Sequence, residues 1–165
     1  MIEYLSSQKN YQGKYLGIDI IPDFIQTAKQ LYGSQDNGSF ILGNFLEQDW
    51  HKQKFDIVSL GSLGVNYDYP NQCGSKSQEY AQRSINLIAS MANLGISLYF
   101  PNADHIDRSK RKPRMAYYQV SEIEQMVLSA FGSRCQEINF ISYPKPKDLK
   151  TIAKIRILPF TDDNT

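Results

Sequence analysis

The sequence predicts an α/β protein with a doubly wound, mostly parallel sheet that ends in an antiparallel hairpin. Along its 165 residues, short apolar runs alternate with segments whose apolar residues recur at helical spacing. This alternation is typical of strands joined by right-handed helical crossovers. The last two apolar runs, about 135–142 and 151–158, are joined only by the turn YPKPKD. That connection is too short for a parallel crossover and therefore predicts a hairpin at the sheet edge.

The N-terminal part predicts a strand followed by a helix. Residues 1–8 indicate a short helix or the end of one, and YLGID at 15–19 is a short apolar run that predicts a strand. Pro22 suits a first helical position, because the missing N–H would be unpaired there in any residue. The apolar residues that follow have helical spacing, and Gly33 fits the end of the helix.

The middle of the chain predicts two more strands, a helix and a fourth strand. SFILG at 39–43 and FDIVSL at 55–60 are apolar and rich in β-formers. A helical stripe runs over about 77–93, Gly95 is interpreted as its end, and the strand ISLYF follows at 96–100.

One more helix separates this part from the final hairpin. Ser121 and Glu124 form an S-x-x-E pattern that predicts a capping box, and Gly132 fits the end of that helix. Two long polar loops, 62–76 and 101–118, follow the third and fourth strands.

Composition limits the possible classes of function. The content of 41% hydrophobic and 21% charged residues is typical of a soluble globular protein, and the net charge of +1 argues against nucleic acid as a partner. No apolar run approaches the ~18 residues of a membrane span, and the N-terminus lacks the pattern of a secretory signal. Cys73 and Cys135 have no metal-like spacing, so we expect reduced thiols, no metal site and a cytoplasmic location.

The order of these motifs resembles the class I S-adenosylmethionine-dependent methyltransferases. The resemblance covers about 15–158 and rests on YLGIDIIPDFIQTAK, FILGNF, FDIVSLGSLG and the terminal hairpin. It implies a Rossmann-like methyltransferase fold, with one domain over residues 1–160 and a polar tail at 161–165. In that family a first strand and a glycine-rich turn precede these motifs, so the fold expected here is N-terminally truncated.

The missing strand has a physical consequence. In the family it lies between the strands that correspond to 15–19 and 55–60, and without it two inner edges lack backbone partners. Each unsatisfied buried group costs roughly 1–3 kcal/mol, against a total stability of about 5–15 kcal/mol. We therefore expect either a gap in the sheet or a direct pairing of these two strands. We also expect this chain to bind S-adenosylmethionine weakly or not at all unless the glycine loop is restored.

The resemblance implies a cofactor site that begins at Asp19. Its carboxylate would accept hydrogen bonds from both ribose hydroxyls, and Ile20 would pack on the ribose or adenine. Asn44 and Phe45 stand where the family often has an aspartate and an apolar residue that contact adenine. The structural alternatives are a solvated acid, a core isoleucine and a turn asparagine.

Further site residues are predicted in the two long loops. The resemblance implies that Gly61 and Ser62 lie near the methionine part of the cofactor, although Gly61 also suits a plain turn. Tyr67, Asp68 and His105 are the catalytic candidates, because they could position or deprotonate an acceptor. Loop residues of these types more often serve turns and surfaces.

The run DRSKRKPR at 107–114 places five positive charges in eight residues. It could hold a phosphate, an acidic substrate or nucleic acid, or it could be a solvated loop.

The predicted function is therefore transfer of the sulfonium methyl group to a small-molecule acceptor. Such chemistry depends on alignment of the reacting atoms more than on acid–base groups. One alternative is a cofactor-free binding or interaction module whose exposed sheet edge would pair with a partner strand, for example by dimerisation. Another is a nicotinamide-dependent oxidoreductase, which the terminal hairpin argues against.

Overall fold

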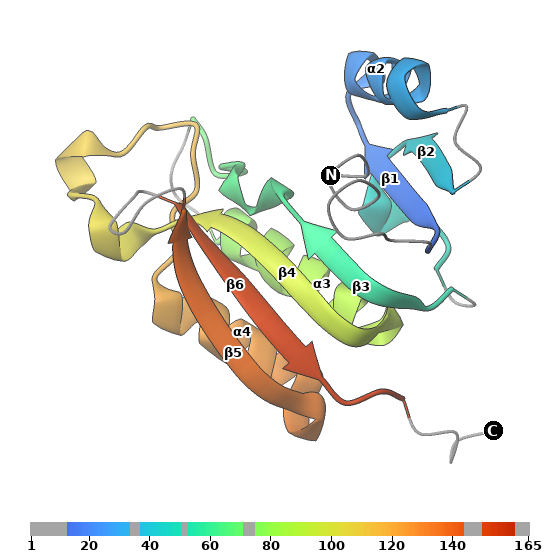
Figure 1. The fold of residues 1–165 in the computed structure, drawn as a ribbon. Coiled ribbons are helices and arrows are strands. Elements are labelled where there is room, and N and C mark those ends of the chain that lie inside the picture. Colours follow the sequence, from blue (N-terminus) through green and yellow to red (C-terminus); the bar gives the residue numbers. More distant parts are fainter. Residues whose placement is uncertain (1–12, 34–36, 51–52, 71–74, 144–149, 161–165) are drawn as a thin grey trace. The chain divides into compact units, whose positions relative to one another are not determined.

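The computed structural model describes residues 13–33, 37–50, 53–70, 75–143 and 150–160 (Figure 1). They belong to two compact units, which divide between Asp49 and Trp50. The helix predicted at 1–8 lies outside the described residues. The single domain over residues 1–160 remains a prediction.

The first unit contains the strand–helix–strand segment predicted from the sequence. Its elements are β1 (Tyr15–Asp19), α2 (Pro22–Tyr32) and β2 (Gly38–Leu42). β1 and β2 pair in parallel from Tyr15↔Gly38 to Asp19↔Leu42. α2 has proline in its first turn, as predicted, and contacts both strands. The carboxyl ends of the two strands therefore lie side by side.

The second unit contains a four-stranded mixed sheet. Its strands are β3 (Phe55–Leu60), β4 (Ala92–Pro101), β5 (Cys135–Tyr143) and β6 (Lys150–Ile157), in the order β3-β4-β6-β5. β3 and β4 are parallel, whereas β6 is antiparallel to both β4 and β5. The predicted terminal hairpin at the sheet edge is confirmed.

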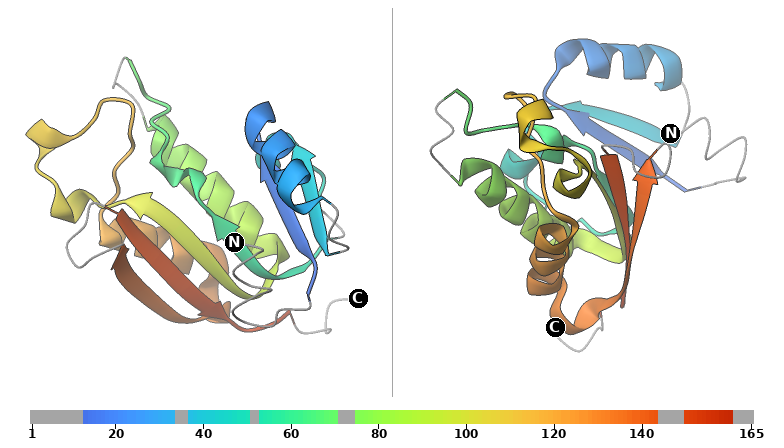
Figure 2. Two further views of the ribbon diagram at one scale, coloured as in Figure 1. Left: turned by 45° about the horizontal axis from the view of Figure 1, so that its top comes forward. Right: turned by 90° about the vertical axis from the view of Figure 1, so that its left-hand side faces the viewer.

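Two helices cover one face of this sheet, α3 (Lys76–Met91) and α4 (Val120–Phe131) (Figures 1 and 2). The buried core includes Ala81, Ile85 and Ile88 of α3, Ile123, Val127 and Phe131 of α4, and Ile96, Leu98 and Phe100 of β4. Burial of a large apolar side chain contributes about 1.5–3 kcal/mol relative to exposure. Single 3₁₀ turns occur at Phe45–Glu47, Ser62–Gly64, Ala103–His105, Arg108–Lys110 and Gly132–Arg134.

The strands of the described residues form two separate sheets. β1 pairs with β2, β3 pairs with β4, and no ladder joins β1 to β3 among the described residues. The alternative of a direct pairing between β1 and β3 is thus not seen among the described residues. β3 consequently has one open edge within the described part of the chain, and its Ile57 is 63% exposed.

The prediction that Gly95 ends a helix is wrong. α3 ends at Met91, and Gly95 lies inside β4, opposite Ile57 and Arg156. A Cβ at this position would lie 3.0 Å from the carbonyl oxygen of Ile155. The glycine therefore permits close approach of β6 rather than a turn.

The predicted capping box is also wrong. The box at the start of α4 is formed by Gln119 and Glu122, not by Ser121 and Glu124. Both patterns have the same spacing, and Gln119 has the extended backbone of a cap residue (φ −69°, ψ 151°). Gly132 does end the helix, with φ 52°, where glycine is favoured.

Candidate functional site

Asp19 lies at the carboxyl end of β1, beside the residues that follow β2. Its Oδ1 accepts a hydrogen bond from the backbone N–H of Ile21 at 2.9 Å, which orients the carboxylate. Its carbonyl oxygen accepts from the N–H of Gly43, also at 2.9 Å. The structure thus brings Asp19 next to the segment that contains Asn44.

Ile20 is not a core residue, because 66% of its surface is exposed. Removal of a large apolar side chain from water is favourable. Ile20 therefore gives the tip of β1 an apolar surface next to a carboxylate.

Asn44 caps the 3₁₀ turn Phe45–Glu47. Its Oδ1 accepts from the N–H of Leu46 at 3.1 Å, and its Nδ2 donates to Glu47 Oε1 at 3.0 Å. These bonds engage both ends of the amide. The geometry therefore supports a structural role for Asn44, and Phe45 beside it is half-buried.

Gly61 and Ser62 begin the loop after β3 in the second unit. A Cβ at Gly61 would meet no atom within 4 Å, and its φ of −105° suits any residue. Neither packing nor backbone conformation therefore explains the glycine. Ser62 Oγ lies 2.8 Å from the hydroxyl of Tyr80, so the serine is tied to α3.

Tyr67 stacks against Tyr80 in the same loop region. The ring centroids are 4.4 Å apart, and 42% of Tyr67 is exposed. Burial, with a smaller contribution from the Tyr80 hydroxyl, raises the pKa of Tyr67 to about 12. Tyr67 is therefore a neutral phenol at pH 7, able to donate a hydrogen bond but poorly suited to accept a proton.

Asp68 caps the start of α3. Its two carboxylate oxygens accept from the backbone N–H groups of Lys76 and Ser77, each at 3.0 Å. The bond from the Ser77 N–H is the largest cause of a lowered pKa for Asp68 and outweighs the opposing effect of desolvation. A carboxylate held this way is a weak base.

The loops after β3 and β4 contact each other in the second unit. Val65 and Met115 form an antiparallel bridge, and the N–H of Ala116 donates to the Gly64 carbonyl at 3.1 Å. The buried Tyr118 donates its hydroxyl to the Ser77 carbonyl at 2.8 Å. Sequence reasoning missed Tyr80 and Tyr118, because a single tyrosine gives no local signal of a distant partner.

His105 lies in a different part of the second loop. It lines an open, polar pocket of about 730 Å³ whose lining residues all come from residues 103–110. This pocket therefore does not join His105 to Tyr67 or Asp68.

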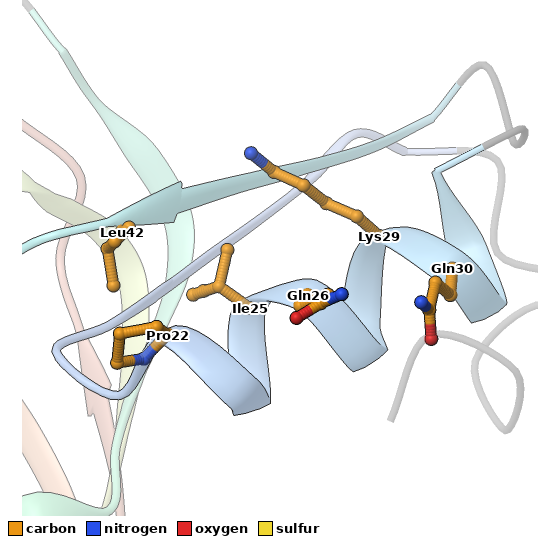
Figure 3. Close-up of a pocket in the computed structure, with 6 residues that line it drawn as sticks. All are labelled: Pro22, Ile25, Gln26, Lys29, Gln30 and Leu42. Carbon is orange, nitrogen blue, oxygen red and sulfur yellow. The ribbon is translucent and has the colours of Figure 1, made fainter.

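Another shallow pocket lies in the first unit, between α2 and β2 (Figure 3). It measures about 450 Å³ and is lined by Pro22, Ile25, Gln26, Lys29, Gln30 and Leu42. None of the predicted cofactor residues lines it.

Two kinds of feature are absent from the described residues. No group of three His, Cys, Asp or Glu side chains there is arranged to hold a metal ion. No helix in the same ranges is both long and apolar enough to cross a membrane. Cys73 and His51 lie outside these ranges.

Comparison with known proteins identifies similar solved structures. No protein-family model and no curated protein matches the sequence. Magnesium protoporphyrin IX methyltransferase from Synechocystis PCC 6803, solved with bound S-adenosylmethionine, has a TM-score of 0.58 at 18% identity. The match covers 87% of this chain and 59% of that one.

Two further structures extend the likeness. The N-methyltransferase NodS from Bradyrhizobium japonicum WM9 has a TM-score of 0.59 at 12% identity, over 88% of this chain and 74% of that one. The [4+2]-cyclase SpnF has a TM-score of 0.62 at 11% identity, over 95% and 71% of the two chains. At such identities the likeness shows a shared fold.

Proposed function

We propose that this chain, which has the fold of class I S-adenosylmethionine-dependent methyltransferases, binds that cofactor and transfers its methyl group to a small molecule. The observation that carries the proposal is the oriented Asp19 carboxylate, which lies beside Gly43 and next to the exposed Ile20. A carboxylate can accept from two adjacent ribose hydroxyls, and an exposed apolar side chain suits the nucleoside. One structure with this fold was solved with bound S-adenosylmethionine.

Residues at the tip of β1 would hold the nucleoside half of the cofactor. Asp19 would hold the ribose and Ile20 would contact the nucleoside, whereas Asn44 already caps a turn and would contribute less. Gly61 and Ser62 remain the proposed contacts to the methionine part, and the open space at Gly61 is consistent with close approach of a ligand. The cofactor supplies a methyl group already activated on a sulfonium.

The acceptor would lie against the joined loops after β3 and β4. Tyr67 would orient it through a donated hydrogen bond, because its raised pKa of about 12 keeps the phenol protonated. Asp68 would act only through its cap of α3. The chain would thus accelerate transfer chiefly by alignment.

Titration calorimetry with S-adenosylhomocysteine tests this function. The titration would compare this chain, a form extended upstream in its reading frame by about 40 residues to include a glycine-rich turn, and Asp19→Asn variants of both. Asparagine can still accept from the Ile21 N–H, so the turn is kept while the charge is lost. We expect tighter binding by the extended form and about tenfold weaker binding after Asp19→Asn.

Asp23→Asn is the matched control, because it removes a carboxylate from the first turn of α2. It should leave the affinity unchanged. Equal binding by wild type and Asp19→Asn, or no binding by either form of the chain, would contradict the proposal.

A second candidate function is a cofactor-free binding module. The open edge of β3 within the described residues and the exposed Ile57 favour it, since unpaired strand edges recruit other strands. The absence of S-adenosylhomocysteine binding, with self-association through β3, would support this candidate. β6 pairs antiparallel with β4, as expected for the terminal hairpin. This hairpin argues against a nicotinamide-dependent oxidoreductase.

A further inference from the structure

The loop between β4 and α4 concentrates positive charge. Residues 107–114, here called the basic loop, contain five cationic side chains and one carboxylate, although the whole chain carries only +1. The ion pair found in the loop joins Lys110 Nζ to Asp107 Oδ2 at 3.8 Å, with both side chains at least three-quarters exposed (75% and 78%). Such a pair contributes little, so most of the charge is not compensated.

Backbone contacts hold the end of the basic loop in place. The N–H of Asn66 donates to the Arg114 carbonyl at 3.2 Å, and its Nδ2 donates to the Pro113 carbonyl at 2.6 Å. Together with the Val65–Met115 bridge, these bonds attach the loop to the segment after β3. The charge therefore lies next to the predicted acceptor region, at the carboxyl ends of two parallel strands, where α/β proteins commonly bind ligands.

The two arginines near this attachment have different environments. Arg111 is half-buried, donates from Nη2 to the Ala103 carbonyl at 3.0 Å, and lies over the ring of Tyr117. It therefore braces the loop. Arg114 is exposed, and its guanidinium carbon lies 5.4 Å from the centroid of the Tyr69 ring.

Arg114 has no ion-pair partner among the described carboxylates, and Lys112 nearby in sequence is exposed and similarly unpaired. Two carboxylates of the adjoining segments accept backbone hydrogen bonds: Asp68 caps α3, and Asp104 accepts from the N–H of Val120. Contact with Tyr69 restricts the guanidinium and lowers the cost of ordering it on a ligand.

We propose that Arg114 and Lys112 bind a carboxylate or phosphate group of the acceptor, which makes the substrate an anionic small molecule. Guanidinium and ammonium groups both bind such oxyanions, and the arginine fork can bind two oxygens at once. The inference rests on the proposed methyl-transfer function. One short loop on a chain of net charge +1 offers too few phosphate contacts for a typical nucleic-acid interface.

Titration of the ¹⁵N-labelled full chain at low salt tests this site. Inorganic phosphate and succinate serve as separate probes of the two oxyanions. We expect saturable shifts of the backbone amides of Tyr69, Lys112 and residues 114–116 with at least one of them. The double variant Arg114→Gln, Lys112→Gln should weaken that binding by about tenfold or more.

The matched control is Arg83→Gln, Lys154→Gln. It removes the same charge from exposed positions on α3 and β6 and should change the affinity less than about twofold. If both double variants weaken oxyanion binding equally, or if the shifts spread evenly over the protein, the anions bind through general charge attraction and the specific site is refuted. Tighter, strongly salt-dependent binding of a single-stranded oligonucleotide at these amides would also overturn the inference.

Calorimetry with S-adenosylhomocysteine separates this inference from the proposed function. The double variant Arg114→Gln, Lys112→Gln should bind S-adenosylhomocysteine normally. Asp19→Asn should in turn retain binding of phosphate or succinate. If the unmutated chain binds S-adenosylhomocysteine but neither phosphate nor succinate at these amides, only the substrate class is refuted. An oxyanion site without cofactor binding, in this chain or its extended form, refutes the acceptor role together with methyl transfer.

Discussion

The Asp68 carboxylate shows how neighbours decide the chemistry of a residue. Each of its oxygens accepts a backbone N–H at the start of α3, and these bonds hold its pKa below the usual value. Tyr67, one residue earlier in the chain, has a pKa raised to about 12, mainly by burial. Two residues that both resemble acid–base catalysts in sequence are thus a helix cap and a protonated phenol.

Replacement of Asp68 by alanine should lower the melting temperature at pH 7 by roughly 2–4 °C, because α3 loses its cap. A carboxylate with a lowered folded-state pKa stabilises the protein above its unfolded pKa of about 3.9. That stabilisation is lost as the pH falls through the lower folded pKa. The difference between wild type and Asp68→Ala should therefore shrink below about pH 4.

Circular dichroism melts from pH 3 to 7 measure this effect. Asp56→Ala, which removes an exposed carboxylate from β3, is the control and should show a smaller difference. A difference for Asp68→Ala that stays constant over this pH range would contradict the cap.

At the level of the element, β4 differs most from its prediction. A glycine after a helical stripe normally indicates a helix end. Here Gly95 lies in a strand between β3 and β6, with the Ile155 carbonyl where a side chain would begin. The local sequence cannot distinguish these cases, because the Ile155 backbone that decides between them is 60 residues away along the chain.

Gly95→Ala should lower the free energy of unfolding by about 1–3 kcal/mol, because its Cβ would crowd a backbone atom that cannot move alone. Urea denaturation measures the loss. Ser97→Ala, two residues along the same face of β4, should change stability by less than about 0.5 kcal/mol. Equal effects of the two substitutions would mean that β6 does not approach Gly95 closely.

For the whole molecule, the division of the strands into two sheets is the main finding. β4 has neighbours on both sides, whereas β3 is paired on one side within the described residues. Backbone groups at an open edge exchange hydrogen with solvent more readily than paired ones. The two parallel neighbours should therefore differ in protection.

Hydrogen exchange at low protein concentration should show β3 amides at least about tenfold less protected than those of β4. Equal protection would mean that another strand pairs with β3. Protection of β3 that increases with protein concentration would identify that strand as part of a second copy, which is the predicted homo-oligomer.

The sequence by itself determined the order of the elements, because strands and helices impose different local periods on apolar residues. It placed β1, α2 and β3 at their observed positions and identified the terminal hairpin from a short connection. Only the tertiary structure decided the close approach at Gly95, the engagement of Asp68 with α3, and the attachment of the basic loop to the segment after β3. The reason is physical, because each of these features depends on a contact between two different segments of the chain. The spacing of apolar residues along one segment contains no information about its contacts with another.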